Sequence, residues 1–160
     1  MPETTKTSDD DEASSSTFTK KKPALRDARD FAGALSWLVR DAKCDVHATN
    51  AFGCNASQWA AQRATGSVAM CAYLRDVGVD LTVLNRNGHS AVHKAAVKGN
   101  RDACEWLLAR GGLGLPHLRA DGDGNTPGEM ARLEGHEALA AWLAEKTRTL
   151  EEERSARRGA

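Results

Sequence analysis

Apolar and polar positions along the chain recur with the period of a helical repeat. Each unit carries an aromatic residue followed by leucine, in the pairs Trp37-Leu38, Tyr73-Leu74, Trp106-Leu107 and Trp142-Leu143. The aromatic residues lie 36, 33 and 36 positions apart. A period of this length indicates a stacked array, in which each unit buries its apolar face against its neighbours.

Each unit predicts two helices joined by a tight turn. The first helix begins at a short polar residue that can cap it, and three positions later stands a side chain that can return a hydrogen bond to the cap. The caps are Asn55, Ser90 and Thr126, and their partners are Gln58, His93 and Glu129. Gly66, Gly99 and Gly135 follow at the turn, where glycine readily ends a helix.

The second helix of each unit carries its apolar residues on one stripe. The residues at this helical spacing are Cys71, Tyr73 and Leu74 in one unit and Cys104, Trp106, Leu107 and Leu108 in the next. A loop rich in glycine, asparagine and aspartate precedes the following unit, at 50–53, 85–88 and 121–124. The pattern therefore predicts an all-α chain that repeats helix, turn, helix and loop.

The run 88–99, Gly-His-Ser-Ala-Val-His-Lys-Ala-Ala-Val-Lys-Gly, resembles the ankyrin repeat, whose hallmark is Thr-Pro-Leu-His-x-Ala-Ala. The last unit keeps the Thr-Pro start but has Gly128 and Glu129 in place of leucine and histidine, and the first full unit has Gln58 in place of histidine. The resemblance covers residues 24–147. It implies an L-shaped solenoid of about three and a half helix-turn-helix units, with β-turn fingers and a concave face that binds partner proteins.

The array divides into four units and two tails. We expect residues 24–49 to form an N-terminal capping half-repeat, 50–84 and 85–120 full repeats, and 121–147 a C-terminal capping repeat. In the half-repeat, Leu25, Phe31, Leu35 and Leu38 lie at helical spacing and predict its core-facing side. Residues 1–23 are polar and predict disorder, and residues 148–160 are charged and predict a tail or a helical extension.

Charge and hydropathy exclude several classes of protein. The 22 basic residues balance the 22 acidic ones, so the chain lacks the positive field of a general nucleic-acid binder. No apolar stretch reaches the roughly 18 residues that span a bilayer, and the N-terminus resembles neither a secretory signal nor a transit peptide. We therefore expect an intracellular protein with no nucleic-acid or membrane partner. Lys20, Lys21 and Lys22 form a weak candidate nuclear-import signal, which leaves cytoplasm and nucleus open.

Candidate catalytic and metal-binding residues do not assemble into a recognisable site. His89 and His93 are four positions apart, but a zinc site needs three or four convergent ligands. The resemblance instead implies a structural His93 that bonds to the Ser90 cap and nearby backbone. Cys54 follows a turn glycine, where we expect partial exposure. We expect no enzyme activity, metal or cofactor, and a thiol- or metal-dependent activity at Cys54 and His89 is the remote alternative.

The predicted function is protein–protein recognition through the fingers and the concave face. The candidate contacts that the resemblance implies are Phe52, Arg86, Asn87 and Asp123 in the fingers and Trp59, Arg63, Lys94 and Lys98 in the first helices. The basic members favour an acidic segment in the partner. Trp59 has two interpretations, an exposed anchor or a core residue turned inward by two extra residues before Gly66. We expect a monomer or a subunit of a hetero-complex, and the alternative function is a structural or regulatory subunit that is stable only in a complex.

Overall fold

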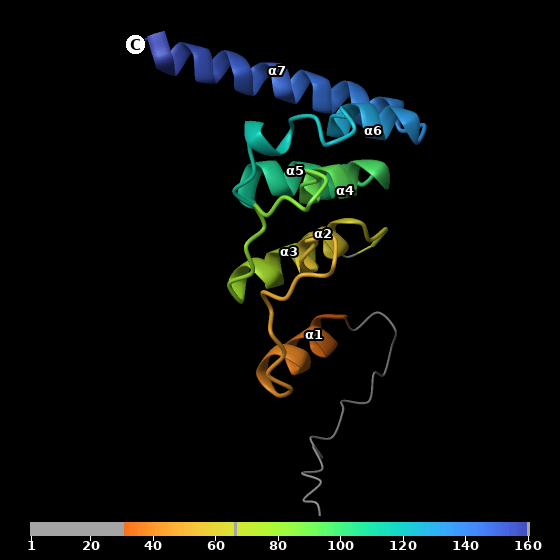
Figure 1. Cartoon of the computed structure of the whole chain (residues 1–160), viewed down its shortest axis with the longest axis vertical. Coiled ribbons are helices and arrows are strands. Elements are labelled where there is room, and N and C mark those ends of the chain that lie inside the picture. The colour runs from red at the N-terminus through yellow and green to blue at the C-terminus, as the bar shows by residue number, and fades with distance from the viewer. Residues whose placement is uncertain (1–30, 66, 160) are drawn as a thin grey trace, which may run out of the picture.

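The computed structural model describes residues 31–65 and 67–159, where all regular structure is helical (Figure 1). The helices are α1 (Phe31–Arg40), α2 (Ala56–Ala61), α3 (Ser67–Asp76), α4 (Ala91–Val97), α5 (Arg101–Arg110), the 3-10 helix η1 (Leu115–His117), α6 (Pro127–Leu133) and α7 (Glu137–Gly159). The segment expected to be disordered, residues 1–23, lies outside the described residues, as do Leu25 and the three lysines of the candidate import signal. The predicted all-α repeat fold is confirmed.

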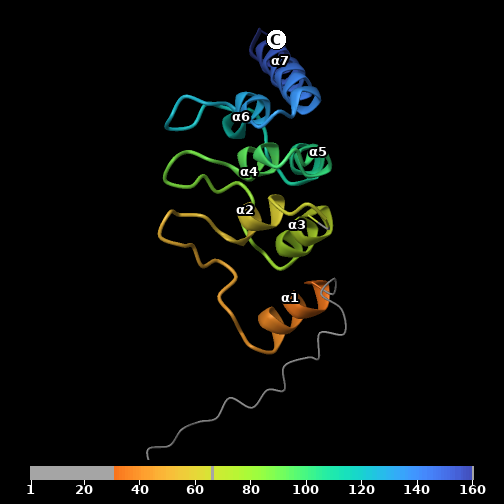
Figure 2. The ribbon, with the colours of Figure 1, turned by 90° about the vertical axis from the view of Figure 1, so that its right-hand side faces the viewer.

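The helices stack in two rows, and the loops project from one side as fingers (Figure 2). The inner row consists of α2, α4 and α6, each in contact with the next. The outer row consists of α1, α3 and α5, again in successive contact. Helix α7 packs on α6 and on η1 and closes the C-terminal end of the array. Each layer therefore contacts only its neighbours, as in other solenoids.

The core lies between the two rows. The inner helices carry alanine where neighbouring layers approach closely, at Ala60, Ala61, Ala95 and Ala96, each at most 2% exposed. The predicted stripe of the outer helices is buried through Cys71, Leu74, Cys104 and Leu107. The small alanine side chains of the inner helices let neighbouring layers approach closely, and the leucines of the outer helices fill the space between the two rows.

Trp106 in α5 and Trp142 in α7 are only partly buried, and each is covered by an arginine of the preceding layer. The guanidinium of Arg75 lies 5.3 Å from the centre of the Trp106 ring, and that of Arg101 lies 4.9 Å from the centre of the Trp142 ring. Cation–π contacts of this kind add to the coupling between layers.

The prediction for the N-terminal helix is wrong at Leu38. Its side chain is 39% exposed, whereas those of Trp37 and Val39 are half-buried. Within the described residues α1 contacts α3, but the inner row begins only with α2. No inner helix of the described residues therefore covers the other face of α1.

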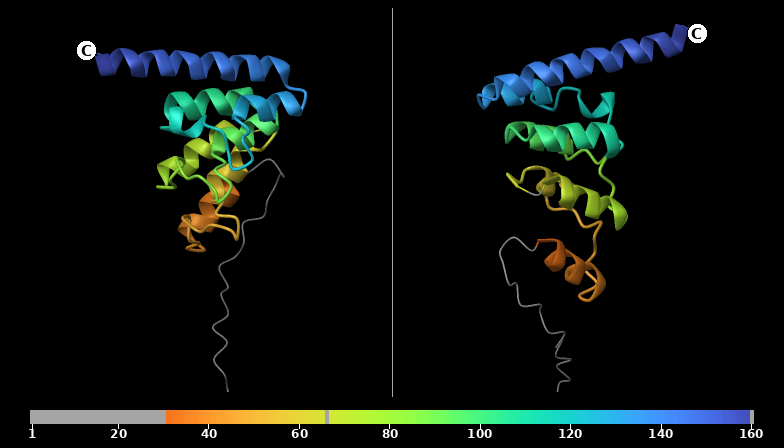
Figure 3. Two further views of the ribbon diagram at one scale, coloured as in Figure 1. Left: turned by 45° about the horizontal axis from the view of Figure 1, so that its top comes forward. Right: turned by 180° about the vertical axis from the view of Figure 1, so that it is seen from behind.

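The C-terminal helix, α7, is more than twice as long as each helix of the outer row. It contains 23 residues, against 10 in α5, because it continues unbroken through the charged residues to Gly159. Of the two forms expected for this end of the chain, the structure shows the helical extension (Figure 3). None of the described helices combines the length and the apolar character needed to cross a membrane.

Candidate protein-binding surface

Each finger is closed by the side chain of its first residue. In the second finger, Asn85 Oδ1 accepts hydrogen bonds from the backbone N–H groups of Asn87 (3.0 Å) and His89 (2.9 Å). Gly88, at φ 80°, adopts the left-handed conformation that favours glycine. The first and third fingers repeat this geometry through Asn50 with Gly53 and Asp121 with Gly124. The three fingers therefore present their tips from the same rigid turn.

Neighbouring fingers are joined through their backbones. The N–H group of Arg86 donates to the carbonyl oxygen of Phe52 at 2.9 Å, and that of Gly122 donates to the carbonyl oxygen of Asn87 at 2.7 Å. The Asn87 amide also donates to the Asp123 carboxylate at 2.9 Å. These bonds fix the spacing between the tips, so the fingers act as one surface.

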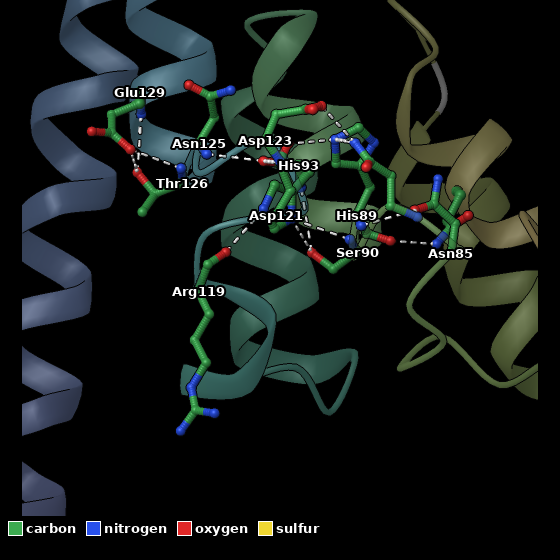
Figure 4. Close-up of polar contacts among 12 residues, drawn as sticks. Asn85, His89, Ser90, His93, Arg119, Asp121, Asp123, Asn125, Thr126 and Glu129 are labelled. Atoms are coloured by element: carbon green, nitrogen blue, oxygen red, sulfur yellow. Dashed lines mark hydrogen bonds and ion pairs between the residues drawn. The ribbon is translucent and has the colours of Figure 1, made fainter.

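A second set of contacts joins the bases of the fingers. His89 Nε2 donates to the Asp121 carboxylate at 2.6 Å, and the side chains are only 13% and 1% exposed (Figure 4). Burial alone raises the pKa of Asp121, but the hydrogen bonds from the Asn125 N–H, His89 and the Asp123 N–H outweigh it and hold the pKa below its usual value. Asp121 is therefore ionised, accepts hydrogen bonds at both carboxylate oxygens and links two repeats.

The equivalent contact one layer earlier involves Cys54. The Asn85 amide lies 3.3 Å from Cys54 Sγ and covers it. Cys54 is 6% exposed, so the expectation of partial exposure is wrong. The thiol fills the space between two fingers and faces the Asn85 amide rather than solvent.

The inner helix α4 begins with a reciprocal cap. Ser90 Oγ accepts from the N–H groups of Val92 (3.2 Å) and His93 (3.4 Å), and the Ser90 N–H donates to His93 Nδ1 at 3.1 Å. Because a backbone N–H can only donate, the proton of the His93 ring is on Nε2, which donates to the Arg119 carbonyl oxygen at 3.1 Å. Burial, with the nearby His89 ring, lowers the pKa of His93 to about 4. His93 is thus a neutral tie between α4 and the loop that follows α5.

The other two inner helices share the cap but differ at its partner. In α6, Thr126 Oγ1 accepts from the Glu129 N–H, and Glu129 Oε2 accepts from the Thr126 N–H, at 3.2 and 2.8 Å. The bonds to Thr126 lower the pKa of Glu129. In α2, Asn55 caps the helix through the Ser57 N–H at 3.0 Å, but Gln58 does not return the bond. The predicted capping role of Gln58 is therefore wrong.

Gln58 instead binds the loop on the other side, in the manner of His93. Its Nε2 donates to the carbonyl oxygens of Val83 (3.0 Å) and His89 (2.8 Å), and the side chain is fully buried. An amide nitrogen has two protons, so one side chain bonds to two loop carbonyl groups, of which that of His89 also accepts from the Asn85 N–H at 3.0 Å.

A groove of about 280 Å³ opens between the first two fingers and the inner helices. Phe52 and Trp59 line it and are 71% and 57% exposed, so Trp59 lies at the surface. Lys94 and Asn87 line the same groove. We name this hollow the aromatic groove, defined by these four residues.

The structure brings together only part of the candidate contact set. The residues that do not line the aromatic groove are Arg63, Arg86, Lys98 and Asp123. The groove also contains Gln62, which the sequence did not single out. Gln62 lies directly after α2, in the stretch between Ala61 and Gly66 that is two residues longer than in the next unit. Since α2 has six residues and α4 has seven, this longer stretch does not extend the inner helix. Its length was the available signal that the surface beside the fingers differs in this unit.

Three of the four ring nitrogens of His89 and His93 form internal bonds, and the fourth, His89 Nδ1, is buried without a partner among the described residues. The His89 and His93 ring centres lie 5.4 Å apart, but His89 Nε2 bonds to Asp121, and both His93 nitrogens bond to backbone groups. Within residues 31–65 and 67–159, no group of three or more histidine, cysteine or acidic residues is placed to hold a metal ion.

The stacked helix pairs and the row of hydrogen-bonded fingers define a helical repeat protein of the solenoid class. A family model described as ankyrin repeats (3 copies) matches residues 26–114, more than half of the chain. The chain belongs to the ankyrin repeat family. Among curated proteins, none matches it. The last helix pair lies beyond the matched residues but repeats the cap and the finger of the others.

Proposed function

We propose that the chain is a non-catalytic module that binds a partner protein through the aromatic groove. Ankyrin repeat domains are commonly protein-binding modules. The observation that carries the proposal is the exposure of two large aromatic side chains, Phe52 and Trp59, at one hollow. Exposed aromatics at a concave site are typical of interface hot spots.

The scaffold around the groove supports tight binding. The turn bonds of Asn50 and Asn85 and the backbone link from Arg86 to Phe52 fix the finger that carries the Phe52 ring. A preformed surface loses little conformational entropy on association. Full burial of one aromatic side chain contributes about 1.5–3 kcal/mol, so these two rings are sufficient for hot-spot energies.

The charge at the groove favours an acidic segment in the partner. Lys94 lines the hollow and has no ion pair with any described residue, and Arg86 stands on the adjoining finger. A partner carboxylate beside Lys94 would complement this charge and increase the association rate at low salt.

The residues around the groove support binding rather than catalysis. Cys54 is buried against Asn85, and the histidines bond to Asp121 and to backbone carbonyls. A catalytic role for Cys54 or His89 would need these bonds to break first. We therefore propose that the thiol- or metal-dependent alternative does not operate.

The test places a photo-crosslinking amino acid at position 52 or 59 of the full chain, with position 133 as the matched control. Leu133 is 72% exposed and does not line the groove. We expect one partner to crosslink from positions 52 and 59 and not from 133, and Trp59→Ala to weaken its binding by about tenfold or more. Equal crosslinking from all three positions would refute the proposed site.

Lys94→Ala and Lys98→Ala form a second matched pair, because only Lys94 lines the groove. We expect Lys94→Ala to weaken binding and to reduce its salt dependence. An equal effect of Lys98→Ala would mean that the contact surface extends along the inner helices, as the family resemblance implies.

Thermal unfolding of the purified full chain tests the alternative of a subunit that is stable only in a complex. A single cooperative transition supports a self-sufficient module. A chain that aggregates, or melts without cooperativity, would favour the subunit.

A further inference from the structure

A second groove lies where the long C-terminal helix passes over the loop that follows α5. Helix α7 passes over the segment that contains η1 and contacts it (Figures 1 and 3). A hollow of about 560 Å³ opens beside this contact. Its apolar floor consists of Leu115, Pro116 and Leu150. It shares no residue with the aromatic groove.

Four arginines surround this apolar floor. They are Arg119 from the loop and Arg154, Arg157 and Arg158 from α7, and we name the hollow the arginine groove. Within the described part of the chain, none of the four forms an ion pair or a side-chain hydrogen bond. Their guanidinium groups are thus available to a ligand.

The missing ion pairs are specific to these arginines and not general to α7. Arg148, on the same helix, contacts Glu145 at 2.6 Å and Glu152 at 4.0 Å. Arg154 and Arg157 continue the face of α7 that carries the buried Leu143 and the half-buried Leu150. This face of α7 therefore carries leucine where it packs on the array and arginine beyond it, next to the apolar floor of the groove.

We propose that the arginine groove binds an acidic segment of a partner protein, one in which carboxylates alternate with apolar side chains. Guanidinium groups bind carboxylates through two parallel hydrogen bonds, a geometry that lysine cannot supply. The partner's apolar side chains pack on Leu115, Pro116 and Leu150. This surface is additional to the aromatic groove, so the inference does not depend on the function proposed above.

The charge pattern favours a protein segment over a nucleic acid. Glu153 lines the groove, and Glu151 and Glu152 precede it on the same helix. A continuous phosphate backbone would meet these carboxylates, whereas a short peptide can place its few acidic residues on the arginines alone. The whole chain has no net positive charge to retain a polyanion.

The test uses the full chain and a fluorescein-labelled peptide that repeats Asp-Glu-Leu three times, followed by fluorescence anisotropy. The control peptide replaces Asp with Asn and Glu with Gln. The variant R154Q/R157Q removes two groove arginines, and Arg148→Gln is the matched control on the same helix. All three positions are exposed, so folding is not at risk, and circular dichroism checks it.

We expect the acidic peptide to bind and the neutral peptide not to bind. R154Q/R157Q should weaken binding by about tenfold or more, since each bond to a charged group is strong. Arg148→Gln should change binding by less than about twofold, because its guanidinium is already paired. R154K/R157K, which keeps the charge, should be intermediate. Retained peptide binding by Trp59→Ala separates this surface from the aromatic groove.

Three outcomes would overturn the proposal. The first is binding that R154Q/R157Q leaves unchanged. The second is equal or tighter binding of an oligothymidine of similar length, which would identify a phosphate site. The third is peptide binding only by a chain whose own acidic segment is neutralised (D9N/D10N/D11N/E12Q), which would mean that residues 9–12 of this chain occupy the groove.

Discussion

Acid should destabilise the array through His93. The pKa of its ring is lowered to about 4 in the folded chain, from 6.5 for a free imidazole, because the ring is buried. Between these two values the unfolded chain binds a proton that the folded chain does not, so the free energy of unfolding falls as the pH falls. The loss is about 2 kcal/mol at pH 5 and about 3 kcal/mol at pH 4, relative to pH 7.

The control is His93→Gln, for which the chain supplies its own precedent. Gln58 occupies the equivalent position, is fully buried and donates to two loop carbonyls. A glutamine at position 93 does not titrate and keeps a donor for the Arg119 carbonyl, but its oxygen, like Gln58 Oε1, is not expected to accept from the N–H of the capping residue. We expect it to lower stability by only about 1 kcal/mol at pH 7. His93→Leu, which leaves both groups without a partner, should cost about 2–5 kcal/mol.

The assay is urea unfolding, followed by far-ultraviolet circular dichroism, at a series of pH values from 7 to 4. The wild-type chain should lose stability over this range by about 3 kcal/mol more than His93→Gln. Asp121 and Glu129 have lowered pKa values, so the stability they contribute is lost as the pH falls below their ordinary values of 3.8 and 4.5, and this loss is common to both proteins. Parallel pH dependence in the two proteins would refute the assignment to His93.

Two further predictions concern the turns and the thiols. Gly99→Ala should lower the free energy of unfolding by about 1–3 kcal/mol, because φ at this position is 64° and the new Cβ would lie 2.7 Å from the His136 ring. Gly135→Ala should cost less, because φ is 80° but the space around the new Cβ is open. Thermal melting of both variants checks this order. Burial raises the pKa of Cys71 to about 11 and that of Cys104 to about 12. Iodoacetamide at pH 8 should therefore modify the exposed Cys44 before these two thiols, and mass spectrometry of the native chain would show the order. Early modification of either buried thiol would mean that the outer helices open in the native state.

Features set by short-range hydrogen bonds were predictable from the sequence. The fingers need an asparagine or aspartate followed by glycine, and the caps need a short polar residue, so each leaves a local signature. Ser90 and Thr126 form the boxes that this signature predicts. Gln58 has the same spacing, but its amide binds carbonyls 25 and 31 positions away. Whether the side chain at this position bonds to its own cap or to a distant loop depends on how neighbouring units stack. The sequence of a single unit does not determine this.

The arginine groove could not be predicted from the sequence for a related reason. Residues 148–160 are charged and contain one leucine, a composition that fits a tail as well as a helix. The groove exists because α7 continues past the array and because η1 places Leu115 beneath it, two features more than 30 positions apart in the chain. Only the folded chain brings them together.

The unit 85–120 contributes residues to both grooves, and His93 connects the two segments of this unit that supply them. Helix α4 supplies Lys94 to the aromatic groove, and the loop after α5 supplies Arg119 to the arginine groove. His93 lies beside Lys94 on that helix, and its Nε2 donates to the carbonyl oxygen of Arg119. Removal of the imidazole should therefore weaken binding at both grooves, whereas Trp59→Ala and R154Q/R157Q each affect one. Since each layer of a solenoid is held by its neighbours, a change at the middle unit reaches both surfaces.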